Sequence, residues 1–135
     1  MGYTHYWNFN EKPSQEKFTQ FIEGVKQIVA TAEEAGIAIG EQVYESGYFS
    51  FNGVADGAHE SFYIELPVGD ERYDDGFCKT GEKPYDTAVT ASLILAKKIF
   101  GDNIKVSSDG DWTDWESGQL LYESVYDIQS ECVFS

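Results

Sequence analysis

The sequence predicts an α+β fold in which a mainly antiparallel sheet of four to five strands packs against two to three helices. Apolar residues alternate with polar ones in several short segments, and they recur at three- and four-residue steps in two long segments. The hydrophobic share of 41% and aromatic share of 16% are enough for a core despite the high charge. With 135 residues, the chain is expected to fold as one compact domain, 1–135.

The first two predicted elements are a strand over 3–9 and a helix over 14–35. Alternation in the strand places four large side chains on one face: Tyr3, His5, Trp7 and Phe9. The helix carries an apolar stripe and is expected to end at Gly36. The stripe consists of Phe18, Phe21, Ile22, Val25, Val29 and Ala32.

A hairpin and a long loop follow this helix. Residues 48–51 and 61–66 are rich in aromatic residues and predict two strands. Asn52 and Gly53 begin a turn, but nine residues separate the strands, so we expect a loose hairpin with a mobile tip. Residues 67–82 contain few apolar positions and are predicted to form a long functional loop.

The second half predicts two more helices and a short strand. Pro84 is placed in the first turn of a buried helix over 84–100, which Gly101 ends. A strand is expected over 104–106. Thr113 and Glu116 fit a capping box for a third helix that runs to about Ser124. Residues 125–135 are compatible with either a strand or a helix.

The charge is the most unusual feature of the composition. Nine basic residues accompany 24 acidic ones, which gives a net charge of −15. Residues 102–135 hold eight acidic side chains and one basic residue, Lys105. This balance disfavours direct binding to nucleic acid or to an anionic membrane, and it favours a partner with a basic surface.

The sequence indicates a cytoplasmic protein. It has no apolar stretch of membrane-spanning length, and residues 1–5 lack the features of a signal peptide. Cys78 and Cys132 are far apart in the sequence and form no metal or redox motif, so we expect two free, buried thiols.

No motif predicts catalysis, a metal or another cofactor. Residues 107–114 place three aspartates around a glycine, but their spacing does not match a calcium-binding loop, so a tight turn before a helix is the simpler interpretation. His5 and His59 are the only histidines, and neither has a ligand partner at short spacing. His59 and Glu60 would point to opposite faces of a strand, and Cys78 lacks a nucleophile signature. We therefore expect a protein that is not an enzyme.

Two clusters have both a structural and a functional interpretation. The acidic run in 70–75 is usually just a solvated loop, but it could form an anionic contact surface with Tyr73 and Phe77 as aromatic anchors. Trp112 and Trp115 share one face of a helix, where core packing is the simpler interpretation.

The chain also resembles a group of short, uncharacterised proteins of bacteriophages and prophages. The resemblance begins at 2–7 (GYTHYW) and continues in order at 51–53 (FNG), 59–62 (HESF), 77–80 (FCKT), 83–86 (KPYD) and 106–111 (VSSDGD). It departs at Gly81 and Glu82, where a basic residue is expected before the KPYD segment. The resemblance implies a small cytoplasmic phage protein and no particular activity.

These observations lead to one main functional hypothesis. The chain would be a phage inhibitor of a host defence system, of the anti-CRISPR or anti-restriction type, whose carboxylates replace phosphates in a basic nucleic-acid-binding groove of a host protein. The predicted partner-binding residues are Asp70, Glu71, Tyr73, Asp74, Asp75, Asp109, Asp111, Asp114 and Glu116.

Two alternatives remain open at this stage. The chain could bind or degrade a small molecule, such as a nucleotide signal, in an aromatic pocket. That pocket would use His5, Trp7, His59, Tyr85 and Trp112. The chain could also be an accessory phage protein whose acidity serves solubility alone.

Overall fold

The computed structural model describes residues 3–66 and 76–134. The strands are β1 (Thr4–Phe9), β2 (Val43–Tyr44), β3 (Tyr48–Phe51), β4 (Phe62–Glu65), β5 (Gly76–Lys79) and β6 (Ile104–Ser108). The helices are α1 (Gln15–Glu34), α2 (Asp86–Phe100) and α3 (Glu116–Tyr126). Short 3-10 helices are η1 (Ala55–Gly57), η2 (Gly101–Asn103) and η3 (Trp112–Trp115).

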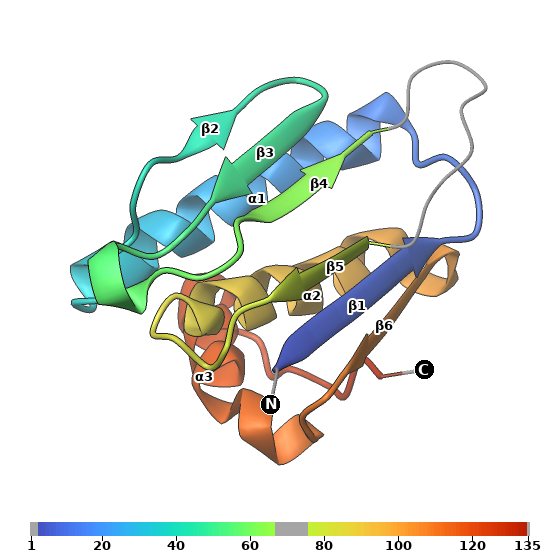
Figure 1. The fold of residues 1–135 in the computed structure, drawn as a ribbon. Helices are drawn as coiled ribbons and strands as arrows, with labels where there is room; N and C mark the ends of the chain where they lie inside the picture. Colours follow the sequence, from blue (N-terminus) through green and yellow to red (C-terminus); the bar gives the residue numbers. More distant parts are fainter. Residues whose placement is uncertain (1–2, 67–75, 135) are drawn as a thin grey trace.

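The α+β class is confirmed, but the prediction of one sheet with four to five strands is wrong. The strands form two three-stranded antiparallel sheets, ordered β5-β1-β6 and β2-β3-β4 (Figure 1). Strands β4 and β5 are neighbours, and the backbone N–H of Glu60 donates to the carbonyl of Lys79 at 3.2 Å just before β4 begins. Farther along the strands, Trp7 and Phe62 pack edge to face between the sheets, with ring centroids 5.3 Å apart. Aromatic side chains therefore pack the two sheets together at a point where no ladder of backbone hydrogen bonds connects them.

Helix α1 follows its prediction closely. The Ser14 hydroxyl caps its start by accepting from the N–H of Lys17 at 3.1 Å, and Gly36 follows its end with φ +94°. All six residues of the predicted stripe are buried. Phe21 contacts Phe49 of β3 and Phe100 of α2, so this helix links the β2-β3-β4 sheet to α2.

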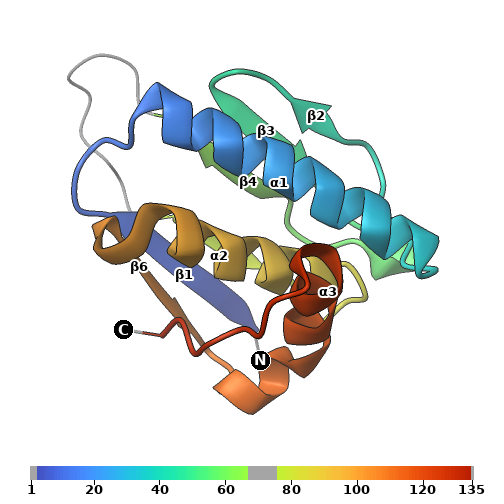
Figure 2. The same cartoon turned by 180° about the vertical axis from the view of Figure 1, so that it is seen from behind.

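Helix α2 is buried through Ala88–Ala96, as its apolar composition predicted. It begins at Asp86 because Pro84 and Tyr85 form a preceding turn. Helix α3 crosses α2 at Gly118, where an added Cβ would lie 1.9 Å from the Thr90 hydroxyl oxygen. The three helices lie on one side of the sheets and leave the other side uncovered (Figures 1 and 2).

The predicted loop over 67–82 is wrong in its second part, because β5 lies within it and pairs with β1. This strand was missed because it begins with a glycine and its one large apolar side chain, Phe77, points outward. Strand β6 is two residues longer than predicted, and its final residues pair with β1. The first part of the predicted loop, 67–75, lies outside the described residues.

The third helix begins differently from the prediction. It opens as η3, and the Asp114 carboxylate accepts from the N–H of Asp111 at 2.7 Å, so the capping pair is not Thr113 and Glu116. Helix α3 then continues to Tyr126. Beyond it, the last described residue, Phe134, forms an isolated parallel bridge with Val106.

The tip of the hairpin between β3 and β4 is ordered by hydrogen bonds of Asn52. Asn52 organises the tip by accepting from the N–H groups of Gly53 and His59 and by donating to the carbonyl of His59. Cys78 is buried, as expected, but Cys132 is exposed because the segment after α3 lies on the surface.

No helix within 3–66 or 76–134 is long and apolar enough to cross a membrane.

Candidate functional site

The uncovered face of the β5-β1-β6 sheet carries two exposed aromatic side chains. Strand β1 alternates, so His5 and Trp7 point into the core while Tyr6 points outward. Tyr6 is paired with Phe77 of β5, and the two side chains are 42% and 60% exposed. Directly paired residues of antiparallel strands lie on the same face, so Tyr6 and Phe77 form an aromatic pair at the surface.

A carboxylate is fixed beside this aromatic pair. One oxygen of Asp109 accepts from the backbone N–H of Thr4 at 3.0 Å, and the other accepts from the Tyr6 hydroxyl at 3.3 Å. The backbone N–H of Asp109 also donates to the carbonyl of Thr4 at 2.9 Å. Asp109 therefore extends the β1–β6 pairing by one residue and presents an exposed, positioned negative charge.

Further carboxylates surround Tyr3 at the same end of the sheet. Burial, together with the nearby carboxylates of Asp86, Asp114 and Glu82, raises the pKa of Tyr3 to about 12. Gly110 packs against this ring closely enough that a Cβ there would lie 2.4 Å from the Tyr3 hydroxyl. We call the exposed acids at this end the acidic edge. It consists of Glu82, Asp109, Asp111, Asp114 and Glu116.

Four of the nine predicted partner-binding residues belong to the acidic edge, and all four are exposed: Asp109, Asp111, Asp114 and Glu116. The other five lie outside the described residues: Asp70, Glu71, Tyr73, Asp74 and Asp75. Sequence reasoning missed Tyr6 and Glu82 as neighbours of these acids. Alternation along 3–9 was a sufficient signal for Tyr6, because it places this side chain opposite the core-facing set.

The five residues of the predicted aromatic pocket do not form one group. His5 and Tyr85 are fully buried, Trp7 is buried against Phe62, and His59 is exposed. Trp112 is half-buried and packs on Trp115, with ring centroids 5.9 Å apart. Most of these rings belong to the core.

His5 instead lies at the centre of a buried hydrogen-bond network. Its Nδ1 is 2.7 Å from the Ser108 hydroxyl, and its Nε2 is 2.6 Å from Asp86 Oδ1. The Ser108 oxygen also accepts from the N–H of Gly110 at 3.0 Å and from Trp115 Nε1 at 3.3 Å. Because two N–H donors already point at this oxygen, the Ser108 hydroxyl donates its own hydrogen bond to His5 Nδ1. The Nε2–H of His5 then donates to Asp86.

This order of hydroxyl, imidazole and carboxylate is also the order of a hydrolase triad. Here, however, the N–H groups occupy the lone pairs that a nucleophilic oxygen would need. His5 has no exposed surface, and the Thr80 hydroxyl also donates to Asp86 Oδ1 at 2.6 Å. The network therefore fixes β1, β6 and the start of α2 beneath the acidic edge.

Cys78 lies in the same interior and is chemically quiet. Burial raises the pKa of its thiol to about 12. The thiol donates to the carbonyl of Glu60 at 3.5 Å, and the Tyr85 hydroxyl donates to the same carbonyl. A thiol with such a pKa stays protonated near neutral pH, where it is neither a nucleophile nor a metal ligand. No group of three or more metal-ligating side chains occurs among residues 3–66 and 76–134.

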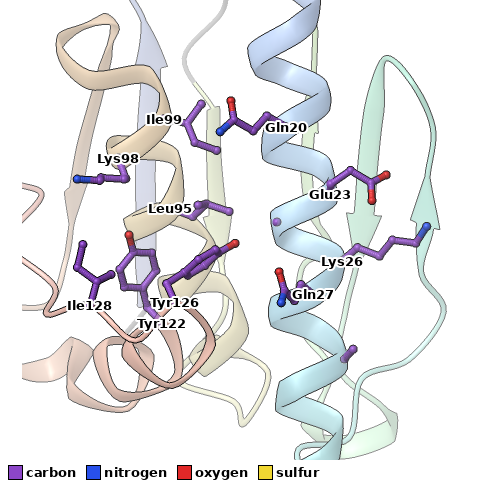
Figure 3. A pocket seen from close by; sticks show the side chains of 12 residues that line it. Gln20, Glu23, Lys26, Gln27, Leu95, Lys98, Ile99, Tyr122, Tyr126 and Ile128 are labelled. Carbon is purple, nitrogen blue, oxygen red and sulfur yellow. The ribbon is translucent and has the colours of Figure 1, made fainter.

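The helical side of the molecule contains a separate groove of about 800 Å³ (Figure 3). Helix α1 forms one wall, and α2 and α3 form the floor and the other wall. The main lining side chains are Gln20, Gln27, Leu95, Ile99, Tyr122 and Tyr126. Burial raises the pKa of both tyrosines, so their hydroxyls remain protonated donors.

Comparisons of the chain with models of protein families, with curated proteins and with solved structures find no match.

Proposed function

We propose that this chain binds another protein at a basic surface that normally holds nucleic acid, and that it acts as a phage-encoded inhibitor of a host defence system. The observation that carries the proposal is the position of Asp109. Its exposed carboxylate is fixed by Thr4 and Tyr6 directly beside the surface pair of Tyr6 and Phe77. The same surface therefore offers an aromatic contact and a positioned negative charge.

Positioned carboxylates support this function better than mobile ones would. Asp109 is held by a backbone N–H, and Asp114 is held by the backbone N–H of Asp111. Each carboxylate keeps lone pairs available for a donor from a partner. Because these side chains are already ordered, binding a Lys or Arg loses less conformational entropy than it would with a freely rotating acid.

The aromatic pair supports a protein partner. Exposed aromatic side chains are common among the residues that dominate binding energy at protein interfaces, and Arg can stack on their faces. Lys79 and Lys105 flank the pair of Tyr6 and Phe77 on the same sheet face. The charges next to the pair are therefore positive, and the negative charge of this surface is concentrated at the acidic edge. We therefore expect the basic groups of the partner to meet the edge and its apolar groups to meet Tyr6 and Phe77.

The experiment is a pull-down from lysate of a bacterial host, with the tagged chain as bait and DNA as competitor. The test variant replaces Asp109, Asp111 and Asp114 with Asn, which removes three charges but keeps an acceptor oxygen at each position. The control replaces three exposed acids outside the acidic edge with Gln: Glu33, Glu41 and Glu45. Both variants change the net charge equally.

Recovery of a nucleic-acid-binding protein by the parent chain and the control, but not by the triple Asn variant, supports the proposal. Added duplex DNA should displace that protein, and its binding should weaken as salt increases. Equal recovery by the parent and by the triple Asn variant would show that the acidic edge is not the contact surface. Retention of the protein at saturating DNA would rule out a shared groove.

A further inference from the structure

The groove between α1 and the α2/α3 pair has a fixed, mostly apolar floor. Gly24 of α1 lies against this floor, and an added Cβ there would be 2.3 Å from Leu95 and 2.7 Å from the Tyr126 hydroxyl. The walls are therefore in direct contact beneath the groove, and the helices cannot close farther. Apolar side chains remain at its surface, and Ile128, which also lines it, is 46% exposed.

The uncharged polar groups that flank this floor are two amides and two phenols, and three charged side chains also line the groove: Glu23, Lys26 and Lys98. Gln20 and Gln27 are two turns apart on α1, and Figure 3 shows both directed toward the groove, opposite Tyr126. Lys26 is directed away from the groove, and its nitrogen lies 5.7 Å from the centroid of the Tyr44 ring. Apolar surface with hydrogen-bonding groups along both sides matches the cross-section of an amphipathic helix.

The charges around the groove determine whether the polar residues of a bound helix should be basic or acidic. The α1 wall includes Glu23 and continues, at helical spacing from its lining residues, into the exposed acids Glu16 and Glu34. On the opposite side, the exposed Asp127 precedes the lining residue Ile128, and the exposed Glu131 lines a neighbouring cavity. Lys98 lines the groove on that side, and Lys97 lines the neighbouring cavity with Glu131. Five acids therefore accompany three lysines around the groove, with Lys26 included, and the net charge of −15 adds a field that attracts cations from a distance.

We infer that this groove binds an amphipathic α-helix whose apolar stripe is bordered by basic residues. The apolar stripe covers Leu95, Ile99 and Ile128, and the basic borders meet the acids of the two rims. The surface lies on the opposite side of the molecule from the pair of Tyr6 and Phe77, so it does not depend on the acidic edge (Figures 1 and 2).

The test uses a fluorescent peptide of about 18 Leu and Lys residues, roughly 27 Å long as a helix, with Leu at helical spacing. Binding is measured by anisotropy. The first control peptide has the same composition with the Leu positions scrambled, and the second replaces every Lys with Glu. We expect the helical Leu/Lys peptide to bind at least about tenfold more tightly than either control, a difference of about 1.4 kcal/mol.

Matched protein variants locate the binding. Ala30 is exposed and lines the groove, so Ala30→Trp should obstruct it and weaken binding about tenfold or more. Thr19→Trp adds the same ring at an exposed position of α1 outside the groove and should leave binding unchanged. Gln27→Trp provides a second obstruction if Ala30→Trp fails to fold.

Equal affinity for the helical and scrambled peptides would overturn the inference, because binding would then be electrostatic and non-specific. Unchanged binding by both obstructed variants would place the peptide elsewhere and would also overturn it. The triple Asn variant of the acidic edge should bind the helical peptide like the parent chain. Loss of binding in that variant would show that the peptide binds at the acidic edge, and it would overturn the inference.

Discussion

The substitution Ser108→Ala should destabilise this protein far more than its size suggests. The Ser108 hydroxyl oxygen is 2.7 Å from His5 Nδ1, 3.0 Å from the N–H of Gly110 and 3.3 Å from Trp115 Nε1. A net hydrogen bond contributes about 1 kcal/mol to stability. Losing three at once should lower the free energy of unfolding by about 3 kcal/mol.

The environment of His5 explains why the loss cannot be repaired. This imidazole has no exposed surface, and Trp115 packs against it with ring centroids 5.0 Å apart. Without the Ser108 hydroxyl, Nδ1 faces a methyl group in an interior that is closed to solvent. A buried polar atom left without a partner costs about 1–3 kcal/mol.

The assay is urea unfolding followed by tryptophan fluorescence, because Trp115 belongs to the network. The matched control is Ser107→Ala on the same strand. Its side chain points outward and is exposed, so the change should stay within about 0.5 kcal/mol. If the two variants unfold at the same urea concentration with the same slope, the network does not stabilise the fold in the way its geometry indicates.

Three further substitutions or reactions test other parts of the structure. Gly118→Ala should lower the free energy of unfolding by about 1–3 kcal/mol in the same assay, since the new Cβ would lie 1.9 Å from the Thr90 oxygen; a gain from helix propensity alone would contradict this packing. Ser92→Ala should raise it by about 1 kcal/mol, because the buried Ser92 hydroxyl has no hydrogen-bond partner among the described residues, and a loss of stability would reveal a partner. With a disulfide reagent near neutral pH, Cys132 should react in the native protein and Cys78 only after denaturation, because burial raises the Cys78 pKa to about 12; two fast-reacting thiols would contradict that burial.

The sequence was most informative where one element repeats its pattern over several turns. The stripe on α1, its Ser14 cap and Gly36 define that helix almost residue by residue. By contrast, β5 has four residues, begins with Gly76 and exposes Phe77, so no local pattern distinguishes it from a loop. The division into two sheets depends on where β4 meets β5, which is a tertiary property.

The candidate surface was predictable in part. The spacing of Asp109, Asp111 and Asp114 around Gly110 identified a charged turn from the sequence alone. Its position beside Tyr6 depends on the pairing of β1 with β6, whose residues are about a hundred positions apart. The partners of His5 were equally hidden, because Asp86 and Ser108 come from two other segments.

The structure also separates acids that serve the fold from acids that do not. Asp109 and Asp114 accept hydrogen bonds from backbone N–H groups, so their presence is explained without a partner. Within the described residues, the Glu82 side chain forms no hydrogen bond or ion pair, and its φ is +58°, a conformation in which glutamate is disfavoured. Within the described residues, no contact of this side chain offsets the cost of its backbone conformation.

Glu82 therefore gives the cleanest test of whether the acidity is functional. Glu82→Asn removes the charge, and asparagine adopts left-handed backbone more readily than glutamate does. The variant should be at least as stable as the parent chain in urea unfolding. A weaker capture of the partner by this variant could then not be attributed to a loss of folding, and it would assign the negative charge itself to binding. Unchanged capture would leave solubility as the role of this carboxylate.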